Sequence, residues 1–356
     1  MKKYIPLKIK MLISKFIFFF RTYIGDIFYL RNIRKKDKII LLEIPTYSNL
    51  GDQAIAYAEK KYFEENFPEK IIYEVCGYYY NWYEKWLLKY VKRDDVIVLI
   101  GGGNFGNQYR DIENRRVRVL EKFKDIPIIS FPQTIYYTDD VEGEKALKKM
   151  QNAMKHNPKA LFFMREKISY ILFEKYFGKP AILIPDIVLY LEKNKDKNGA
   201  KQILLCMRND CEMNNNLKTE IERFLKERFK NVVETDTCVD YSIDLKKIDC
   251  ILEEKWKEFQ DSRLVITDRL HGMIFSLITA TPCIVLPNYN HKIKSFYETW
   301  LEGIEYIYYA ESMEEVKNLI ESINIDKKYC YSKDLFRDNF NIIEQIIREV
   351  LYEYQK

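Results

Sequence analysis

Short apolar runs alternate along this chain with longer segments that have helical spacing. The apolar runs predict buried strands at 38–44, 96–100, 127–131, 160–164, 181–184, 202–207, 262–267 and 283–286. The segments with helical spacing predict helices at 51–66, 143–156, 216–230, 273–280 and 334–354. This alternation is typical of the α/β class with mainly parallel, doubly wound sheets.

The chain is expected to form two domains, because 356 residues is about twice the commonest domain size. The charged stretch 192–200 carries no apolar anchor before Ala200, so it predicts a linker. An N-terminal Rossmann-like domain is then expected at 38–191 and a C-terminal one at 202–330. The helix in 331–356 is expected to cross back and pack on the first domain.

Composition narrows the classes of function. The 58 basic and 53 acidic residues leave a net charge of only +5, which lacks the basic excess of a dedicated nucleic-acid binder. The seven cysteines form no CxxC pair, so we expect reduced thiols, a cytoplasmic protein and no metal site. Cys206 and Cys283 fall in apolar runs and are expected in the core. The 28 tyrosines suit carbohydrate stacking, although a biased genome is the simpler explanation.

The first 37 residues are a basic, amphipathic segment ahead of the first predicted strand. Its apolar run at 11–20 is too short to span a bilayer and is interrupted by Lys15. No small-residue cleavage site follows, so a secretory signal is not expected. Basic and aromatic residues together are typical of an interfacial helix. Residues 1–36 therefore predict either peripheral contact with the inner face of the plasma membrane or a helix packed on the protein's own surface.

The most informative motif is Thr267-Asp-Arg-Leu-His-Gly272. It lies between a predicted strand and a predicted helix, where open α/β sheets bind ligands and helix N-termini favour anions. Arg208 follows another strand, so we expect Arg208 and Arg269 to hold a small dianion while His271 supplies or accepts a proton. The alternative is that each arginine only forms a salt bridge with a nearby aspartate, namely Asp210 or Asp268.

Two glycine-containing motifs follow strands of the first domain. In Asn49-Leu-Gly-Asp52, Gly51 allows close approach of a ligand, and Asp52 could hydrogen-bond a sugar hydroxyl or take its proton. An ordinary helix N-cap is the alternative for this motif. In Gly101-Gly-Gly-Asn104, exposed amides could bind phosphate or sugar oxygens, or the segment could be a flexible turn. The segment matches neither GxGxxG nor a Walker loop, so NAD or ATP binding is poorly supported.

The remaining polar residues after strands have simpler expected roles. Arg165 with Ser169, and Asp186, are expected to cap structure in the first domain. His156 is expected at the solvated end of a helix. His291 lies on a loop after the strand at 283–286 and could line the cleft.

Taken together and in this order, the motifs resemble the polysaccharide pyruvyl transferase family. The matching residues are Asn49-Leu-Gly-Asp52, Ile100-Gly-Gly-Gly103, Phe131-Pro-Gln-Thr134, Arg165-Glu166 with Ser169, Pro185-Asp186, Met207-Arg-Asn-Asp210, and Asp268-Arg-Leu-His-Gly272 followed by Pro282 and Leu286. The resemblance implies two Rossmann-like domains facing across a cleft, in the GT-B-like arrangement. The first domain would be the acceptor side and the second the phosphoenolpyruvate side.

The resemblance also implies the reaction, namely transfer of pyruvate from phosphoenolpyruvate onto two sugar hydroxyls to form a cyclic ketal in exopolysaccharide, capsule or cell-wall glycan biosynthesis. It associates phosphoenolpyruvate with Arg208, Arg269, Leu270 and His271. We expect His271, Arg269, Arg208 and Asp52 to be catalytic. The residues expected to bind substrate are Asn49, Gly51, Gly101, Gly102, Gly103, Asn104, Gln133, Asp210, Leu270, Gly272 and His291.

In this scheme, phosphoenolpyruvate is a co-substrate, and the chemistry requires no metal or redox cofactor. His271 is the candidate acid or phosphate partner, and Asp52 is a weaker candidate base. The sugar acceptor could be nucleotide-, lipid- or polymer-linked. Two alternatives stay open at this point: a sugar-nucleotide glycosyltransferase of the same architecture, and a non-catalytic glycan-binding protein at the membrane surface.

Overall fold

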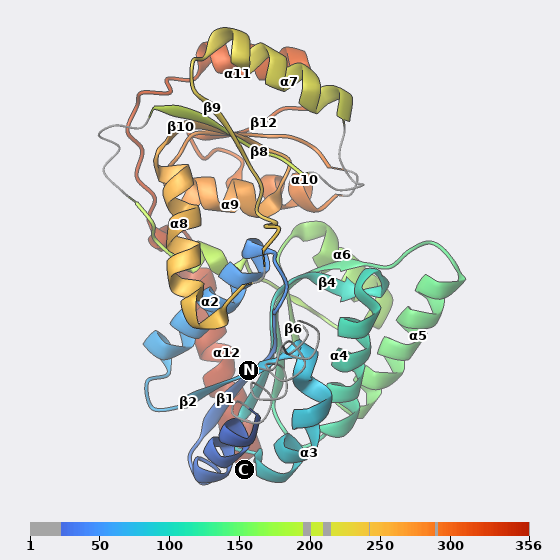
Figure 1. Cartoon of the computed structure of the whole chain (residues 1–356). Helices are drawn as coiled ribbons and strands as arrows, with labels where there is room; N and C mark the ends of the chain where they lie inside the picture. Colours follow the sequence, from blue (N-terminus) through green and yellow to red (C-terminus); the bar gives the residue numbers. More distant parts are fainter. Residues whose placement is uncertain (1–22, 195–200, 209–214, 242, 289–290, 356) are drawn as a thin grey trace, which may run out of the picture.

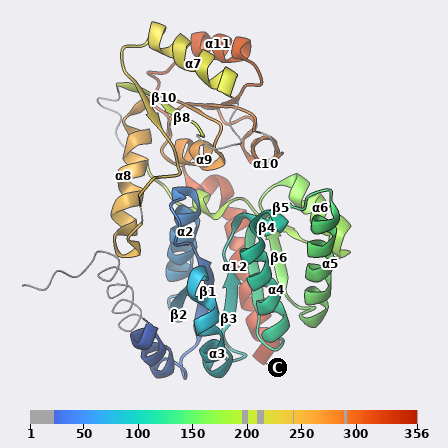
Figure 2. The same cartoon turned by 45° about the vertical axis from the view of Figure 1, so that its right-hand side comes forward.

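Two parallel β-sheets, each with helices on both faces, make up the protein (Figures 1 and 2). The computed structural model describes residues 23–194, 201–208, 215–241, 243–288 and 291–355. Residues 1–22, most of the predicted linker and Asp210 therefore lie outside the described residues. The α/β class with two parallel sheets in a GT-B-like arrangement, which was expected for this chain, is confirmed.

The first sheet has seven parallel strands in the order β2-β1-β3-β5-β6-β7, and β4 pairs with β5 alone. Its strands are β1 (Lys38–Ile44), β2 (Ile71–Cys76), β3 (Val96–Leu99), β4 (Gly102–Gly106), β5 (Ile128–Tyr136), β6 (Leu161–Met164) and β7 (Ile182–Leu183). Alternate side chains of β1 reach opposite faces, so Ile39 and Leu41 join one apolar core while Ile40 and Leu42 join another. Burial on both faces explains why these strands are continuous apolar runs.

Helices cover both faces of the first sheet. They are α2 (Leu50–Asn66), α3 (Tyr80–Tyr90), α4 (Arg110–Lys122), α5 (Val141–His156) and α6 (Lys167–Phe177), with short 3₁₀ turns η1 (Gly77–Tyr79), η2 (Asn107–Tyr109) and η3 (Ile187–Tyr190). Helix α2 lies on one face, while α3, α4 and α5 lie on the other (Figure 2).

The second sheet has five parallel strands in the order β12-β11-β10-β8-β9. Its strands are β8 (Gln202–Cys206), β9 (Val232–Thr235), β10 (Ser262–Thr267), β11 (Cys283–Val285) and β12 (Ile307–Tyr309). Its helices are α7 (Asn215–Arg228), α8 (Ile248–Gln260), α9 (Leu270–Ile278), α10 (Lys292–Phe296) and α11 (Met313–Ser322), with η4 (Leu245–Lys247) and the π-helical turn η5 (Tyr297–Leu301). Cys206 and Cys283 are buried in the core, as expected.

Both sheets reverse their strand order next to the first strand of the unit. Strand β1 lies between β2 and β3, and β8 lies between β9 and β10. Ligands of open α/β sheets bind at the carboxyl ends of the strands at such a switch point. The loops after β1 and β9 meet, because Asn49 forms an antiparallel bridge with Cys238 and the Leu50 amide donates to the Thr237 carbonyl at 2.8 Å. The two switch points therefore adjoin each other.

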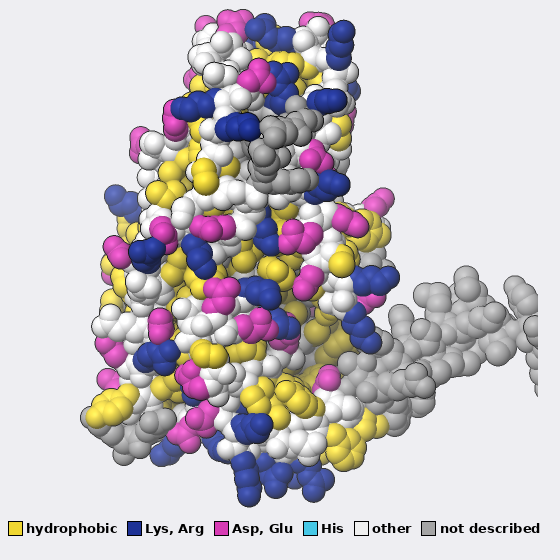
Figure 3. Space-filling model, turned by 90° about the vertical axis from the view of Figure 1, so that its left-hand side faces the viewer, with side chains coloured by type: hydrophobic (Ala, Val, Ile, Leu, Met, Phe, Trp, Pro, Cys, Tyr) yellow, Lys and Arg dark blue, Asp and Glu magenta, His cyan; other side chains and the backbone are white. Residues whose placement is uncertain are grey.

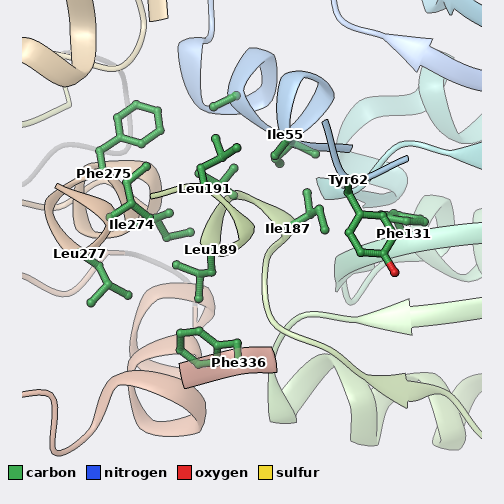
Figure 4. Packing of buried hydrophobic residues seen from close by; sticks show 14 of the residues in the cluster. Ile55, Tyr62, Phe131, Ile187, Leu189, Leu191, Ile274, Phe275, Leu277 and Phe336 are labelled. Carbon is green, nitrogen blue, oxygen red and sulfur yellow. The ribbon is translucent and has the colours of Figure 1, made fainter. Parts of the chain in front are cut away.

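One apolar core joins the two sheets. Figure 4 shows Ile55 from α2, Ile187 from η3 and Phe275 from α9 in the same cluster of buried side chains. The ring of Tyr57 on α2 also meets the ring of Trp256 on α8 edge-on, with centroids 5.7 Å apart. The contact between the two units is therefore a packed hydrophobic interface.

The C-terminal helix crosses back to the first sheet, as expected. The turn η6 (Lys333–Phe336) leads into α12 (Arg337–Gln355). The Tyr62 hydroxyl on α2 donates to the Phe340 carbonyl at 2.9 Å, and Arg348 Nη2 donates to the Asn66 carbonyl at 2.7 Å. Helix α12 thus packs along α2.

The glycine segment after β3 is a strand, and the expectation of an exposed loop or flexible turn was wrong for it. Strand β5 continues to Tyr136 and offers a ladder, on which Gly102 pairs with Gln133. Gly102 and Gly106 have φ of +127° and +128°, and a Cβ on Gly106 would lie 1.9 Å from the Tyr136 carbonyl oxygen. Glycine is needed here for backbone packing, which the sequence pattern alone does not distinguish from ligand approach.

The described end of the N-terminal segment packs on the protein's own surface. Residues 23–32 are helical. The Tyr83 hydroxyl on α3 donates to the Asp26 carboxylate at 2.5 Å, and Trp86 Nε1 donates to the Tyr23 hydroxyl at 3.0 Å. Among the residues that the structure describes, no helix is long and apolar enough to cross a membrane.

Candidate functional site

A cavity of about 160 Å³ lies where the two switch points adjoin. We call it the polar cavity. It is lined by Tyr47, Asn49, Asp52, Gly103, Asn104, Tyr109, Ile112, Arg165, Arg208, Thr237, Cys238, Arg269, Leu270, His271 and Lys292. The residues from Tyr47 to Arg165 belong to the first sheet and its helices, and those from Arg208 to Lys292 belong to the second sheet and its helices. The cavity therefore brings together the two halves of the chain at the carboxyl ends of their central strands.

His271 lies in the first turn of α9 and is nearly fully buried. Its ring packs so closely on α2 that a Cβ on Gly51 would lie 2.1 Å from Nδ1. Nε2 is 3.8 Å from Asp186 Oδ2 and has no hydrogen-bond partner among the described residues. Burial lowers the pKa of His271, and Arg165 lowers it further, although Asp186 and Asp52 act in the opposite direction. The lowered pKa favours the neutral form of the imidazole near pH 7.

Arg165 is a buried cation at the end of β6. Its Nε donates to Thr134 Oγ1 at 2.8 Å, and its Nη1 donates to Asp186 Oδ2 at 2.9 Å. Nη2 is 3.0 Å from the position that a Cβ on Gly103 would take, at the wall of the polar cavity. Capping was the role expected for Arg165 and Asp186. Asp186 does cap η3 by accepting from the Val188 amide, but both residues also approach His271 or the cavity.

Arg208 and Arg269 both line the polar cavity. Arg269 does not pair with Asp268 as expected, and the pairing expected between Arg208 and Asp210 lies outside the described residues. Asp268 accepts a hydrogen bond from the Arg208 backbone amide at 2.8 Å. The Arg269 guanidinium instead pairs with Asp236, with Nε–Oδ1 at 2.8 Å and Nη2–Oδ2 at 2.6 Å. Asp236 follows β9, and this pairing orients the Arg269 fork at the cavity wall.

Helix N-termini add to the positive field in the polar cavity. Helix α9 begins at Leu270, the residue before it provides no side-chain cap, and Leu270 and His271 of its first turn line the cavity. At α2, the Asn49 side chain accepts from the Gly51 amide, so Asn49 is the N-cap of the motif. Asp52 stands in the first turn of α2. The arrangement of cations and amides suits a small, doubly negative ligand.

The first unit also contributes acidic and uncharged polar side chains to the lining of the cavity. The Tyr47 hydroxyl hydrogen-bonds Asp52 at the cavity wall. Asn104 is held from behind, because Arg116 Nη2 donates to its Oδ1 at 2.6 Å. Asp52, Tyr47 and Asn104 thus add oxygen and amide groups to the lining of the cavity.

Several residues expected to bind substrate lie behind the cavity wall. The Gly101 amide donates to the buried carboxylate of Glu59 at 2.8 Å, and Gln133 Nε2 donates to the Ile100 carbonyl at 2.5 Å. Gly272 packs on Thr267, where a Cβ would lie 2.2 Å from Oγ1. These residues, like Gly102, shape the backbone rather than line the cavity. His291 is also absent from the lining, whereas its neighbour Lys292 takes part in it.

Sequence reasoning did not select Arg165, Lys292, Tyr47 or Tyr109 for the site. Arg165 could have been found, because it follows a strand on the same sheet edge as the other motifs. The tyrosines carried no distinguishing pattern. Within the described residues, no group of three or more His, Cys, Asp or Glu side chains has the arrangement of a metal site.

Comparison with known proteins identifies the family. The model of the family "Polysaccharide pyruvyl transferase" matches residues 49–291. General stress protein 30 of Bacillus subtilis is 35% identical, over 82% of this chain and 86% of its own length. Pyruvyl transferase 1 of Schizosaccharomyces pombe is 29% identical, over 75% of this chain and 70% of its own length.

Solved structures show the same fold at low identity. An uncharacterised protein of Klebsiella pneumoniae has a TM-score of 0.51 and 17% identity, with 82% of this chain and 98% of that chain covered. The family match spans the motifs from Asn49 to His291 and every residue that lines the polar cavity except Tyr47 and Lys292. The chain therefore belongs to the polysaccharide pyruvyl transferase family and is a transferase.

Proposed function

We propose that this enzyme transfers pyruvate from phosphoenolpyruvate onto two hydroxyls of a sugar, forming a cyclic ketal and releasing phosphate. The observation that supports this most is the polar cavity itself, where Arg165, Arg208, Arg269 and the first turn of α9 surround a neutral imidazole. Phosphoenolpyruvate carries a phosphate and a carboxylate, so different cations of the cavity could each bind one of these two anionic groups. Family membership supports pyruvate as the transferred group.

The donor is proposed to lie against the second sheet. The amides that begin α9 and the guanidinium of Arg208 would bind the phosphate, because helix N-termini and arginine forks both favour such oxygens. Arg165 would hold the carboxylate across the cavity through Nη2. His271 lines the same cavity, so its ring would be near the reacting carbons.

The reaction balances with one acid and one base. Protonation of the methylene carbon makes it a methyl group and leaves the central carbon cationic. One sugar hydroxyl forms a C–O bond to that carbon, phosphate leaves, and a second hydroxyl closes the ring. The two hydroxyl protons replace those taken up by the methyl group and by phosphate. We assign the acid to His271, whose protonation a bound dianion favours, and the base to Asp52, which lines the same cavity.

Incubation with phosphoenolpyruvate and a panel of sugar glycosides tests the proposal. Release of inorganic phosphate with formation of an acid-labile ketal is the expected result. Stabilisation by UDP- or GDP-sugars, with no response to phosphoenolpyruvate, would contradict it and favour a sugar-nucleotide glycosyltransferase. The double variant Arg208→Gln/Arg269→Gln is expected to release no phosphate. A non-catalytic glycan-binding protein would release none even in its wild-type form.

We further propose peripheral contact with an anionic membrane at the end of the first sheet. Helix 23–32 and α3 expose apolar side chains there, and basic residues surround them. The exposed apolar residues are Ile24, Phe28, Tyr29, Trp82 and Leu88, and the exposed basic residues include Arg31, Arg34, Lys35, Lys36, Lys85 and Lys89. Basic side chains gather at the lower end of the face in Figure 3, beside apolar ones. Such a surface suits an anionic bilayer.

Co-sedimentation with phosphatidylserine vesicles tests this contact. Binding is expected to fall in Phe28→Ser/Leu88→Ser and to be retained in Ile342→Ser, which removes an exposed apolar residue of α12. Equal binding of all these proteins to the vesicles would contradict the proposal. The cytoplasmic location stays a prediction.

A further inference from the structure

A second, larger pocket opens beside the polar cavity. Its volume is about 600 Å³, and we call it the tyrosine pocket. It is lined by Glu43, Ile44, Pro45, Thr46, Tyr47, Gly77, Tyr78, Gln108, Tyr109, Arg110, Asp111, Ile112 and Arg115. Tyr47, Tyr109 and Ile112 line both spaces, so the two adjoin each other. A ligand whose reacting end lies near Asp52 could therefore extend into the tyrosine pocket.

Glu43 is held in this pocket in an uncommon backbone conformation. Its φ is +73°, in the left-handed region that disfavours residues with a side chain. Arg115 on α4 fixes the carboxylate from two nitrogens, with Nε–Oε1 at 2.8 Å and Nη2–Oε2 at 2.9 Å. A Cβ on Gly77 would lie 2.5 Å from Glu43 Oε2, so the chain leaves room for this carboxylate. The backbone of β1, the Arg115 side chain of α4 and the glycine at position 77 thus all accommodate the Glu43 carboxylate.

A β-bulge alone would not require this side chain. The ladder between β1 and β2 shifts its register between Leu42 and Ile44, which accounts for the irregular backbone at Glu43. Glycine or asparagine would adopt the same backbone with less strain. Strained residues persist where the surrounding structure over-determines them, and they concentrate at ligand sites. A carboxylate has about four lone-pair sites, so one that is held by Arg115 can still accept hydrogen bonds from a ligand hydroxyl.

Tyrosine rings form the open walls of the pocket. Tyr78 is 75% exposed, Tyr109 is 50% exposed and Tyr47 is 43% exposed. An aromatic ring offers a flat apolar face and a polar hydroxyl, which matches the alternating C–H and O–H groups of a sugar ring. A space of several hundred Å³ is in the range of pockets that enclose small organic ligands.

The charges of the tyrosine pocket differ from those of a phosphate site. Glu43 and Asp111 balance Arg110 and Arg115 among the lining residues. Both guanidinium groups also have acidic partners, because Arg115 pairs with Glu43 and Arg110 Nη1 is 3.6 Å from Glu142. A nucleoside diphosphate would need an excess of cations that this wall does not offer. Neutral sugar rings fit its charge and its aromatic surface.

We infer that the tyrosine pocket binds the neutral sugar rings next to the one that receives pyruvate, so that the acceptor is at least a disaccharide. This inference rests on the proposed pyruvate transfer for its catalytic readout. Glu43 accepts hydrogen bonds from the hydroxyls of the neighbouring ring, and Tyr78 and Tyr109 cover its faces. The acceptor is then recognised mainly through sugar that does not react.

Direct binding comes first in the test, because it does not depend on turnover. Saturation-transfer NMR is recorded with lactose, cellobiose and N,N′-diacetylchitobiose, with the corresponding monosaccharides, and with UDP-galactose. Stronger transfer to at least one disaccharide than to its monosaccharides is expected, together with loss of that transfer in Tyr78→Ala. Tyr352→Ala, which removes an exposed tyrosine on α12, is the matched control and should retain it. Preference for UDP-galactose, or no preference for disaccharides, would overturn the inference.

Phosphate release from phosphoenolpyruvate supplies the second readout. The disaccharide selected by NMR is compared with the methyl glycoside of its terminal sugar. The disaccharide is expected to have a kcat/KM about tenfold higher or more, and Tyr78→Ala should remove most of that advantage while turnover of the monosaccharide glycoside persists. Equal turnover of both acceptors would overturn the inference and leave the proposed function standing. Absence of phosphate release with every acceptor, with disaccharide binding retained, would overturn the proposed function instead.

Discussion

The polar cavity and the tyrosine pocket adjoin each other but differ in size, in charge and in the type of side chain that lines them. The polar cavity, at about 160 Å³, is small and places Arg165, Arg208 and Arg269 around a buried imidazole. The tyrosine pocket, at about 600 Å³, is wide, balanced in charge and walled by exposed rings. Electrostatic interactions are strong where water is excluded, whereas broad aromatic surfaces recognise shape. The proposed function therefore places the chemistry in the first space, and the further inference places recognition of the acceptor in the second.

The structural support behind the two spaces differs in the same way. The polar cavity is enclosed by strand ends and helix starts from both sheets, and its groups are held by partners such as Asp186 and Asp236. The tyrosine pocket belongs wholly to the first sheet and its helices. Changes in the cavity should therefore affect every acceptor alike, while changes in the pocket should discriminate between acceptors.

The largest expected effect comes from His271→Ala. Loss of a general acid typically costs a factor of about 10²–10⁴, so we expect phosphate release to fall about a thousandfold. Binding of disaccharides, measured by NMR, should be retained because the tyrosine pocket is intact. His156→Ala, at the exposed C-terminal end of α5, serves as the control and should keep full activity. Unchanged turnover in His271→Ala would remove the imidazole from the mechanism.

Gly51→Ala should damage the cavity without changing any polar group. The new Cβ would lie 2.1 Å from His271 Nδ1, so the ring must move. Misplacement of a catalytic group by about 1 Å can cost about a hundredfold, and we expect a loss of that order in kcat. Gly25→Ala is the matched control, because nothing lies within 4 Å of a Cβ at that position. Full activity in a folded Gly51→Ala variant would show that the position of His271 is not critical.

Arg165→Lys tests the cation that sequence reasoning assigned to capping. Lysine keeps a positive charge near Asp186 but loses the fork that reaches Thr134, Asp186 and the cavity together. We expect the KM for phosphoenolpyruvate to rise about tenfold, with a smaller change in the KM for the acceptor. Arg118→Lys, in a surface pair with Glu84, should leave both constants unchanged. A change confined to the acceptor KM would show that Arg165 contributes to acceptor binding rather than to binding of phosphoenolpyruvate.

The smallest expected effect is a shift in pH dependence. Burial lowers the pKa of His271 from its ordinary value of 6.5, so the protonated acid is scarce in the free enzyme at neutral pH. The kcat/KM for phosphoenolpyruvate should therefore fall, by up to tenfold per pH unit, once the pH rises above the pKa of His271, which lies below 6.5. Bound dianion raises this pKa, so the limb of kcat should lie at higher pH.

Asp186→Asn sharpens the pH test. The Asp186 carboxylate raises the pKa of His271, so its removal should move the kcat/KM limb to still lower pH. Measurement of both profiles in buffers of constant ionic strength checks the sign. The titrating group would be another residue if the kcat/KM of the wild-type enzyme began to fall only above pH 6.5. The same conclusion would follow if the pH of the fall were unchanged in the variant.

The sequence predicted the central strands of both sheets because these are apolar on both faces. The strands at β1, β3, β8 and β10 place Asn49, Gly103, Arg208 and Arg269 on the adjoining edges, so most of the cavity was predictable. The edge strand β9 is short and only partly buried, and it was not predicted. The pairing of Arg269 with Asp236 after β9 was therefore out of reach, since it depends on that strand's register.

Other parts of the site depend on three-dimensional packing that one sequence does not express. Gly101 and Gly51 have the same residue type, but one packs against Glu59 behind the wall and the other supports His271. Tyr47 and Tyr109 are two of 28 tyrosines, and only the fold separates them from the rest. Glu43 gives no local sign of its left-handed backbone, because the register shift between β1 and β2 produces it.

The apolar core that runs from α2 to α9 has a consequence for the behaviour of the whole molecule. Two units that share an apolar core, and whose rings pack on each other as Tyr57 does on Trp256, cannot separate without exposing that surface to water. Heating should therefore melt both sheets together in one calorimetric transition, and a ligand seated on either unit should delay the loss of both.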